Sequence, residues 1–229
     1  MLLLCSIVVG DSLGEELSPF KATYKIGIPN ITGAEMTVTV KREDNKLLYQ
    51  SKVTPAGLGK LLNIKAYSYS KIIRLGKYWL PIVYEKEVPD KNKKQLYRFD
   101  WKNYKASVLY KGQQYDLAIS KNTVDENTFQ LKLREDIINS LGADFEQDYT
   151  LLSDGRLKER RFVKKADQTI KTRLGTFKTI RVVRYKDEIP DQIYWLSPEH
   201  NYLPLKIVKL SDEKVKTTLT LTSLVVFDE

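Results

Sequence analysis

The chain has 229 residues, of which 42% are hydrophobic, so it can form a core and is too apolar for a wholly disordered protein. It carries 38 Lys and Arg against 29 Asp and Glu, and this net charge of +9 favours contact with anionic surfaces. One Cys, one His and two Met offer too few ligands for a structural zinc site. We therefore expect no cofactor and no bound metal, although an all-carboxylate calcium site stays open.

The N-terminal segment Met1–Gly10 is apolar but is shorter than the roughly 20 residues that a membrane span needs. It is typical of the apolar part of a secretory signal peptide, and the small residues Ser12 and Gly14 favour cleavage after Gly14. No Lys or Arg precedes the apolar run, and the alternative is a buried N-terminal strand. We expect an exported mature chain, residues 15–229, that has lost Cys5 with the signal.

The first part of the mature chain alternates apolar and polar residues with the period of two that is typical of half-buried strands. Phe20–Ile28, Ala34–Lys41 and Leu47–Val53 predict a meander of three antiparallel strands. The segment Pro55–Leu62 contains two glycines and predicts either a plain connection or a short apolar plug.

Further strands follow as far as residue 119. Pro81 lacks an N–H group, so it predicts an edge position or a bulge in its strand. The predicted strands of this part are Ile64–Ile73, Tyr78–Tyr84, Tyr97–Trp101, Tyr104–Tyr110 and Tyr115–Ile119.

One helix is predicted, from Val124 to Leu141. Thr123 and Glu126 have the spacing of a capping box, and Gly142 follows at the position that often ends a helix. Apolar residues recur at helical spacing along it, so one face should be buried against the concave side of the sheet. These residues are Phe129, Leu133, Ile137, Ile138 and Leu141.

The remaining chain returns to strands, with a turn at Leu174–Thr176 where Gly175 is free to take a positive φ. The predicted strands begin at Tyr149 and include Arg156–Lys165, Ile180–Val183, Ile193–Leu196, Leu203–Val208 and Lys214–Phe227. The fold class is therefore mainly β. A single large antiparallel sheet of about a dozen strands should curl or form an incomplete β-barrel, with one helix packed against it, in a single domain.

Candidate catalytic residues are few. His200 lies in a polar turn without recognisable triad or zinc partners, and Asp100 beside Trp101 is either a perturbed carboxylate or a cross-strand partner for Lys or Arg. The basic run Arg156–Arg161 with Lys164 and Lys165 suggests either nucleic-acid binding or, more simply, a solvated strand face. We therefore expect neither an enzyme nor a partner made of nucleic acid.

Several short motifs occur in an order that resembles a known family. They are Pro19–Tyr24, Phe99–Trp101, Thr172–Phe177, Tyr194–Pro198 and Tyr202–Leu205. Together they resemble the exported bacterial proteins of domain-of-unknown-function family 3108. The resemblance implies a periplasmic protein of the Gram-negative cell envelope without an assigned activity. That family is in turn similar to periplasmic lipoprotein carriers, whose incomplete barrel encloses acyl chains, which is an analogy of fold alone.

Two functions are consistent with these patterns. The first is a non-enzymatic binding protein that holds an apolar or amphipathic envelope ligand, such as a lipid, against aromatic and apolar side chains. The second is a structural or interaction protein that contacts an anionic envelope component through a basic face. For most of the aromatic residues the simpler interpretation, which we favour, is that they fill the core. The candidate ligand-binding residues are Trp79, Tyr84, Tyr97, Phe99, Trp101, Phe129, Leu133 and Trp195.

Overall fold

The structure is a computed structural model that describes residues 18–28, 31–57, 59, 65–76, 78–140 and 144–227. The expected signal segment 1–14 lies outside these residues, as do half of the expected plug at Pro55–Leu62, Leu141 and Gly142. Fifteen strands form a single sheet in the described chain. The prediction of a large sheet with one helix is confirmed, and the strand count is somewhat higher than the dozen expected.

The sheet is a succession of hairpins, because alternating strands are separated by short polar turns. Neighbouring strands are adjacent in sequence up to β8 and again from β9 to β15. The first eight strands are β1 (Phe20–Ile28), β2 (Ile31–Glu43), β3 (Lys46–Pro55), β4 (Ala66–Leu75), β5 (Tyr78–Val88), β6 (Lys93–Asp100), β7 (Lys105–Tyr110) and β8 (Gln113–Ala118).

The second half begins with the short strand β9 and the helix α1 and then resumes the hairpin pattern. Its two outer pairings differ from the rest: β9 lies parallel to β10, and β15 pairs with β1, with Phe20 opposite Val226. The elements are β9 (Thr123–Val124), α1 (Thr128–Asn139), β10 (Glu146–Ser153), β11 (Arg156–Thr172), β12 (Gly175–Lys186), β13 (Ile189–Ser197), β14 (Leu203–Ser211) and β15 (Lys214–Val226).

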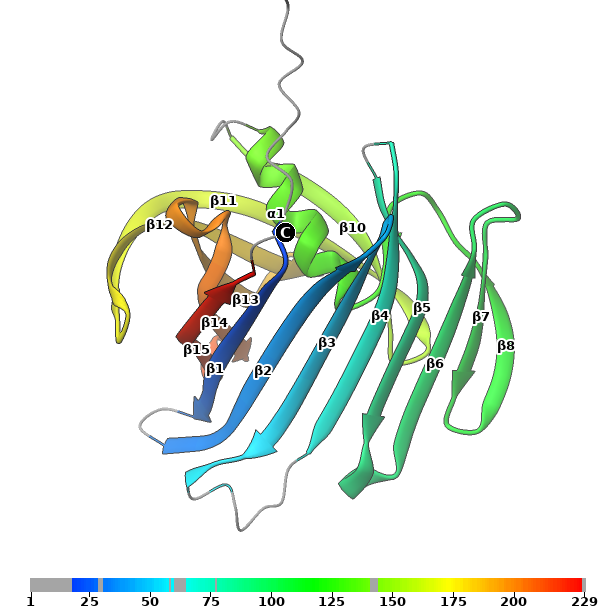
Figure 1. Cartoon of the computed structure of the whole chain (residues 1–229), viewed down its shortest axis with the longest axis horizontal. Helices are drawn as coiled ribbons and strands as arrows, with labels where there is room; N and C mark the ends of the chain where they lie inside the picture. The colour runs from blue at the N-terminus through cyan, green and yellow to red at the C-terminus, as the bar shows by residue number, and fades with distance from the viewer. Residues whose placement is uncertain are drawn as a thin grey trace, which may run out of the picture.

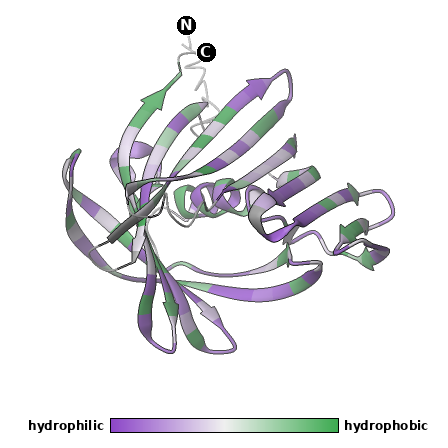
Figure 2. Cartoon of the chain, turned by 90° about the horizontal axis from the view of Figure 1, so that it is seen from below, coloured by the Kyte–Doolittle hydropathy of each residue, from purple (hydrophilic) through white to green (hydrophobic). Residues whose placement is uncertain are grey.

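The sheet curls around α1 without closing into a barrel. The strand order ends in β8 on one side and β9 on the other, and no pairing joins these two strands. Figure 1 shows the strands β1–β6 on one side of α1 and β10–β12 arching behind it. Seen from below, the helix runs inside the curl (Figure 2). The expected incomplete barrel is therefore the observed architecture.

The predicted helix is right in kind but starts too early. Thr123 and Val124 belong to β9, where they pair with Thr150 and Leu151 of β10. The capping interpretation of Thr123 and Glu126 is wrong, because the carboxylate of Asp125 accepts the backbone N–H of Thr128 at 2.9 Å. Short polar side chains such as Asp stabilise turns and helix starts by this kind of local bond.

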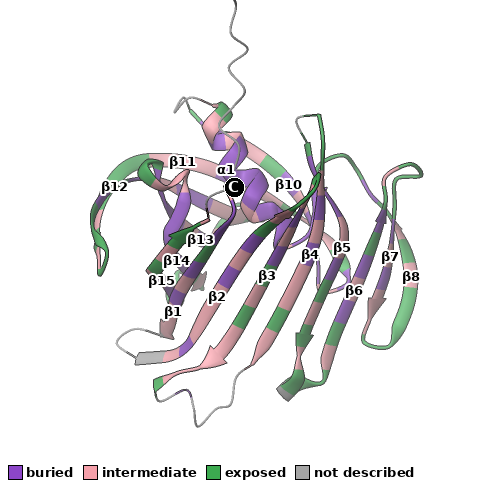
Figure 3. Ribbon diagram, viewed as in Figure 1, coloured by how far each residue is buried: buried purple, intermediate pink, exposed green. Residues whose placement is uncertain are grey.

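The helix is buried on more than one side. Phe129, Leu133 and Ile137 are each no more than 2% exposed, as the apolar stripe predicts. Lys132, Arg134 and Glu135 are also buried, because the sheet surrounds the helix instead of covering one face. Figure 3 shows that burial is concentrated in α1 and in the parts of the strands that lie nearest to it.

Pro81 marks a bulge in an interior strand. Of the two expected alternatives the bulge is confirmed and the edge position is wrong, since β5 lies between β4 and β6. The register between β4 and β5 shifts between Lys71 and Ile72, opposite Pro81, and the ladder to β6 starts only at Val83. The carbonyl oxygen of Pro81 instead accepts the indole N–H of Trp101 at 2.7 Å, so a side chain replaces the missing ladder contact.

The hairpin turn between β10 and β11 packs against the β6–β8 end of the sheet. The hydroxyl of Tyr115 donates to the carbonyl oxygen of Gly155 at 2.6 Å, and the N–H of Gly155 donates to the hydroxyl of Tyr97 at 2.9 Å. Lys93 forms an ion pair with Asp154 at 2.5 Å. A second apolar cluster, centred on Tyr84 and Tyr97, lies beside this contact. Side chains therefore hold together the two ends of the curl that backbone pairing leaves open.

Candidate ligand cavity

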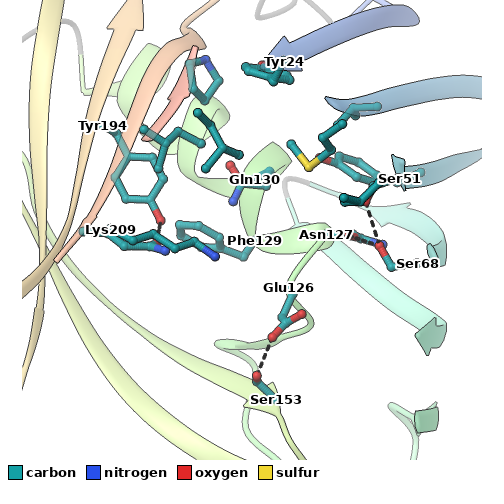
Figure 4. Close-up of a pocket in the computed structure, with 18 of the residues that line it drawn as sticks. Tyr24, Ser51, Ser68, Glu126, Asn127, Phe129, Gln130, Ser153, Tyr194 and Lys209 are labelled. Carbon is teal, nitrogen blue, oxygen red and sulfur yellow. Dashed lines mark hydrogen bonds between the residues drawn. The ribbon is translucent and has the colours of Figure 1, made fainter. Parts of the chain in front are cut away.

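The curl encloses a cavity of about 500 Å³ between α1 and the inward faces of strands from both halves of the sheet. Inward-facing residues alternate along β3 and β4, so Ser51, Val53, Ala66 and Ser68 all contribute to its wall. Figure 4 shows side chains from several elements converging on this space, with Phe129 and Gln130 of the helix between the two walls.

Hydrogen bonds fix the first turn of the helix on β4. Asp125, which is fully buried, accepts the hydroxyl of Ser70 at 2.9 Å and the hydroxyl of Thr128 at 2.7 Å. The amide nitrogen of Asn127 donates to Ser70 at 3.0 Å, and the hydroxyl of Ser68 donates to the Asn127 oxygen at 3.0 Å. Burial raises the pKa of Asp125 to about 6, and the hydrogen bonds to Thr128 oppose this shift. The network positions the helix face that lines the cavity.

One part of the cavity wall is apolar. Alternation along the strands turns these side chains inward and their polar neighbours outward. Phe129 meets them from the helix and packs edge-on against Tyr149 and Tyr194, with ring centroids 5.7 Å and 6.2 Å away. The apolar wall includes Ile26, Met36, Val38, Val53 and Leu219.

The opposite end of the cavity is charged. The ammonium group of Lys86 lies 2.5 Å from the Glu126 carboxylate, and the hydroxyl of Ser153 donates to the same carboxylate at 2.6 Å. Burial by itself raises the pKa of Glu126, but the charge and the hydrogen bond of Lys86 outweigh burial and hold the pKa at about 2. Glu126 is therefore ionised at neutral pH and neutralises its lysine. Figure 4 places Glu126 and Ser153 at the end away from Tyr24.

Two more cations at this charged end belong to the β12–β14 wall. Arg184 holds Asp191 in a two-point ion pair, with both N–O distances at 2.7 Å. Lys209 has no ion pair within the described chain, but this lining residue of the cavity is exposed. Asp191 therefore neutralises Arg184, whereas Lys209 keeps contact with solvent although burial of part of its side chain lowers its pKa.

Arg134 lies near the apolar part of the same cavity and is only 4% exposed. Its Nε donates to the carbonyl oxygen of Asn201 at 2.8 Å, and its guanidinium lies over the ring of Phe20, 5.1 Å from the centroid. Sequence reasoning missed this residue. The available signal was weak: a cation within an apolar helical segment, four residues after Gln130.

The predicted aromatic site residues do not form one surface. Only Phe129 of the eight candidates lines the cavity. Trp79 and Leu133 are buried in the main core, whereas Tyr84, Tyr97 and Phe99 form the second cluster with Trp101 packed against it. The indole N–H of Trp195 donates to Gln168 at 2.8 Å, and the ammonium group of Lys206 lies over its ring. Aromatic character predicts burial but does not say which of several packed regions a side chain joins.

The other residues singled out from the sequence, Asp100 and His200, take part in local turn and packing contacts. Asp100 is exposed and accepts the backbone N–H groups of Lys102 and Asn103, which makes it a turn residue, and the hydrogen bonds of Asn103 lower its pKa. His200 lies in the expected turn, where its ring packs 5.4 Å from the ring of Phe177. Within the described ranges no cluster of three His, Cys, Asp or Glu residues is arranged to hold a metal ion. No described helix is long and apolar enough to span a bilayer.

Comparisons with known proteins place this architecture among proteins of unknown function. The profile of the family "Protein of unknown function (DUF3108)" matches residues 19–220. A crystal structure of a β-barrel-like protein of domain of unknown function DUF1849 from Brucella abortus is similar, with a TM-score of 0.60 and 12% sequence identity. The similarity covers 93% of this chain and 99% of that chain, and at this identity it shows a shared fold only. No curated protein matches the chain.

Proposed function

Because the chain belongs to the DUF3108 family, whose function is unknown, we propose its function from its own geometry. It is a non-enzymatic periplasmic binding protein that holds an apolar or amphipathic ligand of the cell envelope, such as a lipid, inside the curled sheet. The single observation that carries this proposal is the cavity of about 500 Å³ with an apolar wall at one end and charged and polar groups at the other. Ligand pockets typically measure about 300–1,000 Å³ and have this mixed lining.

The roles of the buried polar groups favour binding over catalysis. Asp125 holds the start of the helix, and Glu126 holds Lys86 and Ser153. A nucleophilic mechanism needs a base within hydrogen-bond reach of the nucleophile and a third group that orients the base. The carboxylates at the cavity are instead engaged by cations, hydroxyls and backbone N–H groups. This supports a site that positions a ligand without transforming it.

The alternative, an interaction protein with a basic face, has less support from the same structure. The basic run on β11 is largely neutralised by neighbouring acids: Arg161 pairs with Glu188, and Lys158 pairs with Asp154 at 2.8 Å. Paired surface cations attract an anionic partner less than the net charge of +9 suggests. The same neutralisation argues against a nucleic-acid partner.

A cavity-filling substitution tests the proposal. Ala66 lines the cavity, so Ala66→Trp places an indole in the space that a ligand would occupy. Ala166→Trp makes the same substitution at an exposed position of β11 and is the matched control. The readout is the fluorescence of N-phenyl-1-naphthylamine, a neutral apolar dye, titrated with each purified protein.

The parent protein and the control should bind the dye, and Ala66→Trp should weaken binding by about tenfold or more, since an overfilled site has to expand. Equal dye binding by all three proteins would place the dye elsewhere and contradict the proposal. Absence of dye binding by the parent would contradict it as well. Mass spectrometry of lipids that copurify from cell envelopes then identifies the natural ligand.

A further inference from the structure

A polar stripe on α1 and its preceding turn faces the cavity. Asn127, Gln130 and Arg134 are spaced by three and four residues, so they lie on one side of the helix, and all three line the cavity. The side chain of Asn127 is bonded to Ser68 and Ser70 on β4. The amide of Gln130 has no hydrogen-bond partner among the described residues. Burying such polar side chains beside an apolar wall costs free energy unless a polar group of a ligand enters the space and forms hydrogen bonds with them.

Arg134 is the least compensated member of the stripe. Its Nη1 is buried and has no hydrogen-bond partner in the part of the chain that the structure describes. No carboxylate there lies within 4 Å of its guanidinium, and its Nε donates to a neutral carbonyl oxygen, that of Asn201. Burial lowers the pKa of Arg134 to about 10, which still leaves it charged at neutral pH. The folded protein therefore keeps a buried positive charge without a counter-ion, which is unfavourable in the absence of a ligand.

The other cations of the cavity do not share this condition. Lys86, Lys158 and Arg184 each have a carboxylate within 2.8 Å, Arg160 lies 3.9 Å from Asp191, and Lys209 is exposed to solvent. Since paired and solvated charges gain little from a further anion, the strongest demand for a negative group lies at Arg134.

Two tyrosines complete the surroundings of the guanidinium. Tyr24 of β1 and Tyr49 of β3 line the cavity and are 3% and 6% exposed. Within the described chain neither hydroxyl has a hydrogen-bond partner. Burial raises the pKa of both phenols, and the charge of Arg134, close to both, opposes this rise. Both hydroxyls are therefore protonated at neutral pH and able to donate to an anion.

Resting on the proposed function, we infer that Arg134, with Tyr24 and Tyr49, binds the carboxylate of a long-chain amphipathic acid whose chain lies along the apolar wall. A carboxylate offers two oxygens to a guanidinium fork and accepts further hydrogen bonds from hydroxyls. Its single negative charge also matches the single charge of the Arg134 guanidinium, whereas a phosphate monoester brings up to two charges. The apolar wall that receives the chain includes Ile26, Met36 and Val38.

The test measures displacement of N-phenyl-1-naphthylamine by dodecanoic acid, dodecanol and dodecyl phosphate at pH 7.5. The three competitors share one chain length and differ only in the head group. The parent protein should bind the acid about 10- to 100-fold more tightly than the alcohol, which is the effect of hydrogen bonds to a charged group. Dodecyl phosphate should bind less tightly than the acid. Acid and alcohol of equal affinity would overturn the inference but leave the proposed function standing, whereas a parent that binds no dye would overturn both.

Substitutions then locate the head group. Arg134→Met should reduce the preference for acid over alcohol to about threefold or less while dye binding persists, since the apolar wall is unchanged. Tyr49→Phe removes one hydroxyl and should weaken the binding of the acid alone, by about 2- to 10-fold. This variant replaces Arg134→Met in the test if Arg134→Met does not fold. Arg173→Met, the same substitution at an exposed turn, should keep the full preference. A preference that survives in both cavity variants, or a phosphate that binds best, would overturn the inference.

Discussion

Leu133 gives the most direct test of how α1 packs inside the sheet. It is 1% exposed, belongs to the main core and does not line the cavity. Leu133→Ala removes three buried carbons at about 0.8 kcal/mol each, and the unfilled space adds a further term. We expect a loss of about 3–4 kcal/mol in the free energy of unfolding, with unchanged affinity for the neutral dye.

Urea denaturation followed by tryptophan fluorescence measures this loss, provided that the slope with urea is the same for both proteins. Leu174→Ala is the matched control, because Leu174 is 41% exposed at a turn and should cost less than about 0.5 kcal/mol. A cost below about 1 kcal/mol for Leu133→Ala would contradict close packing of this helix against the sheet. It would mean that the helix only covers the cavity and is not part of a close-packed core.

Two further predictions concern the hairpin contact and the helix anchor. Gly155 has a φ of +72°, and an added Cβ would lie 2.5 Å from the Tyr115 hydroxyl, so Gly155→Ala should destabilise by about 2–4 kcal/mol in urea. Gly112→Ala, at a φ of +77° with nothing within 4 Å, should cost only about 1–2 kcal/mol. The unfolded chain loses the Asp125 proton near pH 4 and the folded protein near pH 6. The free energy of unfolding should therefore fall by about 3 kcal/mol as the pH rises from about 4 to about 6. Asp125→Asn should flatten this fall, and an equal pH dependence in both proteins would contradict the shift.

Most strands could be predicted because they are half-buried. From Phe20 to Lys25 the alternation of the sequence is the alternation of burial, and the predicted bounds Phe20–Ile28 equal those of β1. The helix start failed for a different reason. Thr123 and Glu126 have the spacing of a capping box, but β10 offers Thr123 a backbone partner, and Lys86 offers Glu126 a charge. Partners distant in the sequence decided both cases.

The site was less predictable than the fold. Tyr84 and Phe129 are both buried aromatic residues, yet only Phe129 reaches the cavity, because the curl of the sheet creates two separate apolar regions. Arg134 lies in a helix that the sequence did predict, but its missing counter-ion is a property of the assembled interior. No local pattern can report which charge remains unpaired after fifteen strands have been put in order.

The pairing of β1 with β15 has a consequence for how the chain is made. Every other antiparallel pair joins consecutive strands, whereas this one joins residues near position 20 to residues near position 226. During synthesis β1 therefore keeps one unpaired edge until almost the entire chain has emerged, and unpaired edges invite association between chains. The finished sheet ends instead in the short strands β8 and β9, which leave little edge for another chain to pair with. The chain is therefore most prone to aggregation before its last strand, β15, has been synthesised and has paired with β1.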